Sequence, residues 1–411
     1  MKYISFILGI VIAISLAACS EDSSNTPIPR VDIPMSRAES EIVNTTNSFS
    51  LRFFKKVLET ENNNFGASPM SLSMALSMTA NGASGEALSE ILETIGFEAK
   101  DMKDVNTFNS RIVKDLCAVD RTTKISLANS IWIDNSFDVK PGFISDNRNE
   151  YGAEIFNENL GSSATMKKIN SWCKDKTNGM IPNFLDKPLD NNCMIALLNA
   201  LFFNGIWTTP FDESKTEKGN FYNNGETLIQ TSMMQTEFKC RAAHDSEGAN
   251  WVSLAYGNGA YHMIIIQPDH IRPNCVKEYF SNISDDDFEE MLSGLIETKM
   301  KLKMPKFDFE SRIDLKEILM ELGIKKMFDG SGDFSKISDT SLIFKAMQKT
   351  KVTVNEAGTK AAAVTIIDGE VTSPGPVHLE KGTLTIDHPF AFFIREVSTG
   401  AIIFTGCVNN L

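Results

Sequence analysis

An alternating segment near the C-terminus restricts the fold more than any other stretch of the chain. It runs from Phe344 to Pro376 and has the sequence FKAMQKTKVTVNEAGTKAAAVTIIDGEVTSPGP. Over its first third, every second side chain is uncharged, whereas Lys345, Lys349 and Lys351 occupy alternate positions. A period of two residues is typical of a β-strand that buries one face. We therefore expect a strand over 344–354 whose lysines face solvent.

The same alternation resumes after a turn signal. The stretch from Asn355 to Gly358 has the composition of a turn, which would normally end the strand. Beyond it, charges return only at alternate positions, and no proline occurs before Pro374. The uncharged positions of the other parity are Thr359, Ala361, Ala363, Thr365, Ile367 and Gly369. The segment can thus form a buried strand where a loop is expected, although an ordinary hairpin arm fits the same pattern.

Size and charge limit the class of protein. The chain has 411 residues, 42% of them hydrophobic, and a formal net charge of −13. It is long enough for a large core, and its acidic balance argues against nucleic acid or an anionic membrane as the main partner. Its seven cysteines are scattered, without a C-x-x-C pair or a zinc-like Cys/His spacing. We expect no metal site and no cofactor.

Motifs of common enzymes are absent or out of order. The sequence lacks G-x-S-x-G, H-E-x-x-H, a phosphate-binding P-loop and G-x-G-x-x-G. Residues 171–174 fit S-x-x-K and residues 145–147 fit S-D-N, but this order is the reverse of that in β-lactamase-like enzymes, and no K-T-G completes the set. We do not expect the chain to be an enzyme.

The N-terminus has the features of a targeting segment. A positive start at Lys2 precedes an apolar run from Ile4 to Leu16, which is short for a transmembrane span. The next residues, Leu16-Ala17-Ala18-Cys19, resemble a bacterial lipobox, which implies acylation of Cys19; a plain signal peptide with a chance cysteine is the alternative. The following Ser20-Glu21-Asp22 resembles the signal that sends some lipoproteins of the Bacteroides group to the outer surface. These features suggest an outer-membrane lipoprotein, surface-exposed or on the periplasmic face.

Composition divides the chain into three parts. We expect a lipoprotein signal peptide at 1–18, a lipid-anchored tether at 19–37 that is polar and contains three prolines, and a folded domain at 38–411. The six cysteines after Cys19 lie mostly in apolar stretches, so we expect buried free thiols rather than disulfides. Apolar periodicity predicts helices over 38–60, 164–176, 285–296 and 312–322, and strands over 124–134, 251–256, 261–267 and 299–309.

Two further motifs stand out in the folded domain. Ser68-Pro69-Met70-Ser71 can cap and begin a helix, and the helix that follows is apolar on all sides, as in a fully buried helix. The stretch from Cys193 to Phe203 is almost continuously apolar, which indicates a central strand. It runs into an N-x-x-x-F-x-G-x-W-x-x-x-F pattern from Asn199 to Phe211.

Taken together, these motifs resemble those of the serpins. The stretch Glu356-Ala-Gly-Thr-Lys-Ala-Ala-Ala is similar to the reactive-loop hinge of inhibitory serpins, and the motifs at 68–71 and 199–211 and the C-terminal DHPFAFFI and IIFTGCVNN also match. The resemblance covers about residues 38–411. It implies an α+β fold with a large central mixed β-sheet, two further sheets, about eight to nine helices and an exposed reactive loop.

The resemblance also assigns roles to individual residues. It implies a hinge formed by Glu356, Gly358, Thr359, Ala361, Ala362 and Ala363. It implies a sheet-opening region formed by Ser68, Ser71, Asn199, Gln348 and Trp207. Trp207 would cap the top of the sheet where the loop enters, although a plain core aromatic has the same sequence signal.

By the same resemblance, the chain is a monomeric suicide inhibitor of serine proteases. The protease cleaves the loop and forms an acyl-enzyme, and the segment from Gly358 onward then inserts into the main sheet. Counting seventeen residues from Glu356 places the reactive bond at Thr372–Ser373, with Val371–Thr372 next. No Lys or Arg lies between Ala361 and Glu380, so an elastase-like or subtilisin-like protease is the expected target. A non-inhibitory binding protein with the same fold, on the cell surface, is the alternative.

The sequence departs from the serpin pattern at two points. Serpins usually carry a histidine eight residues before the hinge glutamate, and this chain has Gln348 there. A buried glutamine needs a partner, which Asn199 or Ser68 could supply, but it cannot titrate as histidine does. The stretch from Glu356 to Pro389 is also several residues longer than usual, which leaves the exact reactive bond open.

Overall fold

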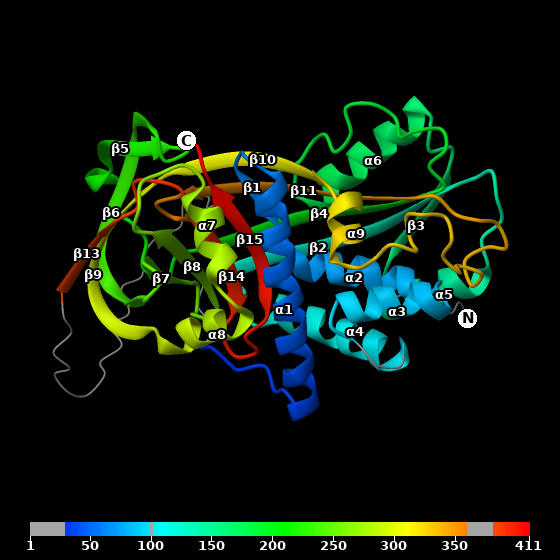
Figure 1. Cartoon of the computed structure of the whole chain (residues 1–411), viewed down its shortest axis with the longest axis horizontal. Coiled ribbons are helices and arrows are strands. Elements are labelled where there is room, and N and C mark those ends of the chain that lie inside the picture. Colours follow the sequence, from blue (N-terminus) through cyan, green and yellow to red (C-terminus); the bar gives the residue numbers. More distant parts are fainter. Residues whose placement is uncertain (1–28, 98–101, 360–380) are drawn as a thin grey trace, which may run out of the picture.

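The fold is that of a computed structural model, which describes residues 29–97, 102–359 and 381–411. These residues form nine α-helices and two β-sheets, so the α+β prediction is confirmed (Figure 1). The helices are α1 (Arg37–Thr60), α2 (Pro69–Ala80), α3 (Gly85–Thr94), α4 (Met102–Ala118), α5 (Pro141–Tyr151), α6 (Ser163–Lys176), α7 (Cys275–Asn282), α8 (Asp285–Gly294) and α9 (Lys316–Leu322).

The strands divide between a six-stranded and a nine-stranded sheet. The central sheet has the order β10-β11-β12-β4-β2-β3. Its strands are β2 (Thr123–Asp134), β3 (Glu154–Glu158), β4 (Ile195–Ile206), β10 (Phe307–Asp314), β11 (Phe344–Asn355) and β12 (Gly358–Thr359). The other sheet comprises β1 (Phe65–Ala67), β5 (Glu217–Asn223), β6 (Thr227–His244), β7 (Ala249–Tyr256), β8 (Tyr261–Pro268), β9 (Ile296–Pro305), β13 (Lys381–Thr385), β14 (Phe390–Glu396) and β15 (Ile402–Val408).

The two smaller sheets expected from the resemblance are halves of one hydrogen-bonded sheet. Strand β6 is long enough to serve both halves, since it pairs with β9 over Met233–Ala242 and with β7 over Arg241–His244. One half contains β5, β6, β9 and β13, and the other contains β7, β8, β14, β15 and β1. The central sheet is mixed, as expected: β11 and β4 are parallel, whereas β4 and β2 are antiparallel.

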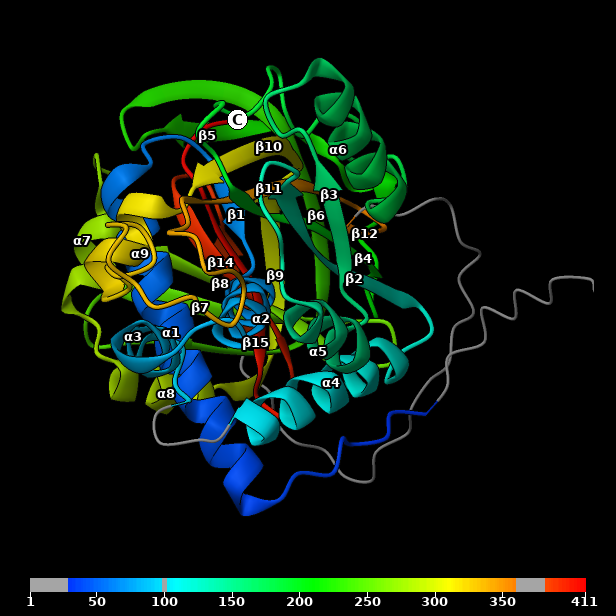
Figure 2. The same ribbon diagram turned by 90° about the vertical axis from the view of Figure 1, so that its right-hand side faces the viewer.

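Helix α2 lies at the centre of the molecule, as its apolar sequence predicts. Its N-cap is Ser68, whose side chain accepts a hydrogen bond from the backbone N–H of Ser71 at 3.1 Å, and Pro69 occupies the first turn. All of its residues except Met70 are buried. Figure 2 shows α2 nearly end-on between α1, α3 and the strands of both sheets.

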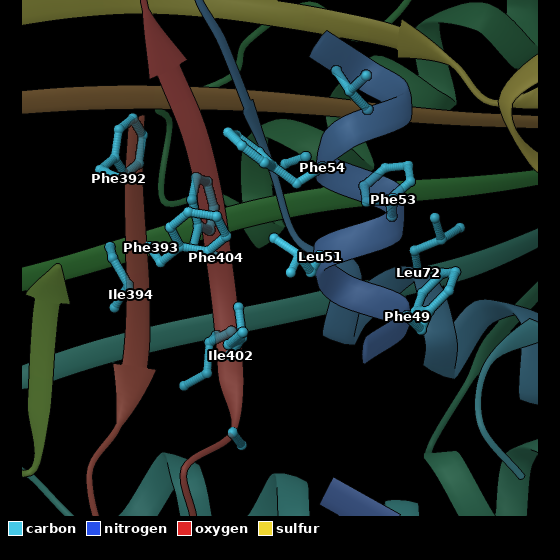
Figure 3. Close-up of a cluster of buried hydrophobic side chains, with 14 of the residues drawn as sticks. Phe49, Leu51, Phe53, Phe54, Leu72, Phe392, Phe393, Ile394, Ile402 and Phe404 are labelled. Atoms are coloured by element: carbon cyan, nitrogen blue, oxygen red, sulfur yellow. The ribbon is translucent and has the colours of Figure 1, made fainter. Parts of the chain in front are cut away.

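Aromatic side chains join α1 to the nine-stranded sheet. Phe54 on α1 packs at 4.8 Å from the ring of Phe393 on β14 and at 4.8 Å from the ring of Phe280 on α7. Figure 3 shows Phe49, Phe53 and Phe54 on one side of this cluster, with the side chains of β14 and β15 opposite. The cluster fixes the helix against the sheet through apolar burial and edge-to-face ring contacts.

One prediction for β11 is wrong. Lys349 was expected to face solvent, but it is buried and forms an ion pair with Glu310 at 3.3 Å. The cause is α6 and the chain after it, which cover this face of the sheet; the Lys349 ammonium also donates to the carbonyl of Asn183. A second apolar cluster fills the space between them and includes Ile169, Trp172, Leu198 and Met347. The central sheet is therefore covered on both faces over the part of β11 that contains Met347 and Lys349.

Several predicted boundaries shift. The helix expected over 312–322 begins only at Lys316, because residues 307–314 alternate and pair along their whole length with β11. The helix expected over 285–296 ends at Gly294, and Ile296 begins β9. The folded part of the chain begins before residue 38: Ile33 is buried, and its N–H donates to the hydroxyl of Ser398 at 2.9 Å.

The cysteines after Cys19 are free thiols, as expected, but one is not buried. Cys117 is exposed, and the other five are buried. Burial raises the pKa of Cys173 and of Cys193 to about 12, so these thiols stay protonated at neutral pH. Among the described residues no helix combines the length and apolarity needed to cross a bilayer. The predicted signal peptide and Cys19 lie outside the described residues.

We expect Phe54→Ala to lower the free energy of unfolding by about 3–5 kcal/mol, because it removes a fully buried ring from the α1 cluster. Leu228→Ala is the control, since Leu228 is half exposed on β6, and it should cost no more than about 1 kcal/mol. Urea unfolding followed by tryptophan fluorescence measures both. Equal losses for the two variants would show that the cluster does not carry the packing between α1 and the sheet.

Candidate functional site

The site lies where the chain leaves β11 and turns back into the central sheet. Strand β12 consists of only Gly358 and Thr359, and it lies between β11 and β4. Thr359 pairs with Val354 on one side and with Gly205 on the other, both antiparallel. Two residues of the alternating segment thus already separate β4 from β11 at the end of the sheet next to the hinge. We call this end the top of the gap between the two strands.

The turn that leads into β12 is built by Asn355 and Gly358. The side-chain oxygen of Asn355 accepts hydrogen bonds from the N–H groups of Ala357 at 3.0 Å and Gly358 at 3.2 Å, as in an Asx turn. Gly358 has a φ of +154°, and a Cβ added there would lie 2.1 Å from the carbonyl oxygen of Gly205. Only glycine fits this position, which accounts for the glycine in the predicted hinge.

Glu356 fastens the turn to the rest of the molecule. Its carboxylate accepts a hydrogen bond from the hydroxyl of Thr216 at 2.6 Å and forms an ion pair with Lys306 at 2.8 Å. Its carbonyl oxygen accepts from the N–H of Phe211 at 2.8 Å. Burial alone would raise the pKa of Glu356, but the contacts with Lys306 and Thr216 outweigh burial and lower it. The carboxylate therefore stays ionised at neutral pH.

Two aromatic side chains close the top of the gap. The indole N–H of Trp207 donates to the carbonyl of Asn355 at 3.0 Å, and the backbone N–H of Trp207 donates to that of Ala357 at 2.9 Å. The Trp207 ring stacks on Tyr256 at 4.3 Å. The hydroxyl of Tyr256 lies 2.6 Å from that of Thr359, and burial raises the pKa of Tyr256, so the phenol stays protonated. Trp207 and Tyr256 thus hold both ends of the hinge turn.

A buried polar network crosses the central sheet below the hinge, at the level of Gln348 on β11. The side-chain oxygen of Gln348 accepts from the N–H of Ser68 at 2.8 Å, and its amide donates to the carbonyl of Ser68 at 3.0 Å and to Asn199 at 2.7 Å. The amide of Asn199 donates in turn to the hydroxyl of Ser71 and to the side chain of Asn129. The network ties β11, β4 and β2 to the start of α2, and both partners suggested for Gln348 are used.

Strands β4 and β11 are joined directly below the hinge. Seven residue pairs link them in parallel register, from Phe344 with Ile195 to Thr350 with Leu201. We call this junction the β4–β11 seam. A longer strand can enter the sheet after Thr359 only if the seam opens. In the structure the seam is closed by direct pairing of β4 and β11.

Some residues of the predicted site fall outside the part of the chain that the structure describes. Ala361, Ala362 and Ala363 of the hinge and Val371, Thr372 and Ser373 of the reactive bond lie outside the described residues. No cluster suited to a metal ion occurs within the described part of the chain. The other predicted residues lie close together along β4, β11 and the hinge turn. They are Glu356, Gly358, Thr359 and Trp207 at the hinge, and Ser68, Ser71, Asn199 and Gln348 in the polar network.

The comparisons with known proteins agree with this geometry. The family model described as serpin (serine protease inhibitor) matches residues 44–411. The chain belongs to the serpin family. It is 33% identical over 375 residues to iripin-3 of Ixodes ricinus, which covers 89% of this chain and 94% of that protein. It is 28% identical to alpha-1-antitrypsin 1-4 of Mus musculus, with 95% and 93% of the two chains covered.

Solved serpin structures share the whole fold. The native state of the thermophilic serpin tengpin matches with a TM-score of 0.81 at 30% identity, covering 94% of this chain and 97% of that one. A complex of thyroxine-binding globulin with thyroxine matches with a TM-score of 0.78 at 25% identity, covering 91% and 99%. The family resemblance of the sequence motifs is confirmed.

Several residues that hold this serpin's hinge were missed from the sequence. Thr216, Tyr256 and Lys306 contact the hinge, and Asn129 completes the network around Asn199. Each lies far along the chain from its partner and has no local signature. Asn129 alone had a usable signal, since it falls in the predicted strand 124–134 as a polar residue of the buried parity.

Replacing Gln348 should weaken the network. We expect Gln348→Leu to lower the free energy of unfolding by about 1–3 kcal/mol for each buried group left unpaired, chiefly the N–H of Ser68 and the side-chain oxygen of Asn199. The midpoint of urea unfolding measures the loss.

The matched control is Gln235→Leu, the same substitution on the accessible side of β6, where the Gln235 amide donates to the carbonyl of Lys215 in an exposed position. It should change the midpoint by less than about 1 kcal/mol. If Gln348→Leu is no more harmful than Gln235→Leu, the network does not hold the sheet to α2.

Proposed function

We propose that this serpin inhibits a serine protease as a suicide substrate. A single observation carries the proposal: Gly358 and Thr359 already lie between β4 and β11, so insertion of the following residues would extend a strand that has begun. In the proposed mechanism the protease cleaves the loop and remains attached to it as an acyl-enzyme. The freed segment then inserts, as strand addition to a sheet, and carries the protease with it.

Backbone geometry supports a long displacement. About a dozen inserted residues at roughly 3.3 Å each would move the attached protease by ~40 Å. The side chains facing the interior would be small or uncharged, namely Thr359, Ala361, Ala363 and Thr365. Small side chains suit this position because Thr359, the first of them, is already buried against Tyr256. The native state would then store free energy that insertion releases.

The target follows from the residues of the loop. We propose cleavage at Thr372–Ser373, or at Val371–Thr372, by an elastase-like or subtilisin-like protease with a small apolar pocket. The alternative remains a non-inhibitory serpin that acts as a binding protein. The absence of charge, bulk and proline at the alternate positions from Thr359 to Thr365 favours inhibition, because such groups would block burial in the sheet.

Location is a separate part of the proposal. We propose that Cys19 carries a lipid that anchors the protein in an outer membrane, with the folded domain exposed to soluble proteases. The support is confined to the lipobox-like residues 16–19 and the acidic residues after them. The relatives described above come from a tick and a mouse and lend no support to a bacterial lipoprotein.

Cleavage by a panel of serine proteases tests the target class. We expect elastase-like and subtilisin-like proteases to cleave at Thr372–Ser373 or one residue before it, and the mass of the released C-terminal peptide identifies the bond. Trypsin should be a poor target, since the segment between Ala361 and Glu380 contains no Lys or Arg. A stable trypsin complex cut at Lys381 would overturn this assignment.

Insertion itself is tested by a pair of arginine variants. Ala361→Arg places a charge at a position that must be buried in the inserted strand, at a cost of about 3–5 kcal/mol. Ala362→Arg makes the same change on the opposite parity, which it shares with the native Lys360. We expect Ala361→Arg to be cleaved at the normal rate without trapping the protease, and Ala362→Arg to trap it as the wild type does.

The measurement is the fraction of protease held in a denaturant-resistant complex, together with the melting temperature before and after cleavage. Cleaved wild-type protein should melt higher than intact protein, because the inserted strand adds hydrogen bonds and burial. If both variants trap protease equally well, or if cleavage does not raise the melting temperature, the loop does not insert. The protein would then act as a binding protein with the serpin fold.

A further inference from the structure

An exposed face of β6 and β9 carries four lysines. We call Lys239, Lys299, Lys301 and Lys303 the lysine face. Side chains alternate between the two faces of a strand, and the register pairs Lys239 of β6 with Lys299 of β9, so the four lysines lie on one side of the sheet. Leu302 and Met304 have the opposite parity and are buried in the core. Lys239 and Lys301 are exposed, and Lys299 and Lys303 are partly exposed.

The arrangement of charges on this face is unfavourable for the isolated molecule. Lys239 and Lys299 are directly opposite each other in the antiparallel pairing of β6 and β9. Like charges in such positions destabilise a sheet. Two glutamates offset part of the repulsion: Glu237 pairs with Lys299 at 2.7 Å, and Glu217 pairs with Lys303 at 2.8 Å. The face retains an excess of positive charge on a chain whose net charge is −13.

The lysine face lies beside the point where the reactive segment rejoins the fold. Strand β13 begins at Lys381 and lies beside β9 (Figure 1). In the register of this pair, Lys381 is the partner of Lys299. Seven residues separate Ser373 from Lys381. They can span at most about 30 Å, roughly the diameter of a small domain. A protease bound at the proposed reactive bond is therefore within reach of this surface.

We propose that the lysine face is a docking surface for an acidic patch next to the active site of the target protease. This inference rests on the proposed inhibitory function and goes beyond it by naming the chemistry of the contact. Attraction between the two surfaces accelerates encounter and orients the protease toward the loop. A long polyanion fits the face less well, because Glu237 and Glu217 interrupt the positive charge and would repel it.

A charge-reversal pair tests the proposal. The double variant Lys239→Glu, Lys301→Glu removes the exposed positive charges of the lysine face. The control is Lys103→Glu, Lys114→Glu, which makes the same change in net charge on exposed positions of α4, at the other end of the molecule in Figure 1. The association rate constant with a protease that the wild type traps is measured at several ionic strengths, together with the stoichiometry of inhibition.

We expect the lysine-face variant to associate about 10-fold more slowly at low salt, with a weaker dependence on ionic strength, and to keep the wild-type stoichiometry. The α4 control should stay within about 2-fold of the wild type. Equal rates for both variants overturn the proposal. A changed stoichiometry with an unchanged rate also overturns it, because the lysines would then act on insertion. So does a loss of rate seen only when a sulfated polysaccharide is present, which would assign the face to a polyanion. Failure of the wild type to trap any protease would instead reject the proposed function.

Discussion

The direct contact between β4 and β11 is the constraint on which the rest of the structure depends. Parallel pairing from Phe344 to Thr350 closes the central sheet, and Gln348 locks the seam to Asn199 and to the start of α2. Above it, β12 enters the same gap and is held by Tyr256 and the turn at Asn355. Strand β12 thus separates β4 from β11 at the hinge, whereas the two strands pair directly with each other below it.

Strand polarity favours the proposed insertion at the seam. In the observed structure, β4 and β11 share one parallel ladder below the hinge. The added residues of β12 pair antiparallel with both neighbours. An extended β12 would exchange that single parallel ladder for two antiparallel ladders, which are slightly more stable per residue. Against this gain stands the apolar cluster under α6, where Leu198 and Met347 pack across the seam and would have to separate.

The sequence predicted what depends on local pattern. The alternation over 344–354, the cap at Ser68 and the apolar run from Cys193 each describe the burial of a short stretch, and the structure agrees with them. The features that were predicted wrongly or missed depend on contacts between segments far apart in the sequence. Lys349 is buried because α6 covers it, and the clamp on Glu356 comes from Thr216 and Lys306, which adjoin it only after folding. The fusion of two smaller sheets also follows from the length of β6, which pairs with β9 and with β7.

The polar network at the seam, centred on Gln348, contains no titratable side chain, whereas the hinge contains the carboxyl group of Glu356. A glutamine does not titrate, so its bonds to Ser68 and Asn199 are the same at every physiological pH. Glu356, in contrast, has a pKa lowered by Lys306 and Thr216 despite its burial. A carboxyl whose pKa is lower in the folded state adds stability that is fully present above its unfolded pKa and is lost as the pH falls through its folded pKa. The clamp on the hinge is therefore retained near neutral pH and weakens only in acid, while the network that closes the seam stays unchanged.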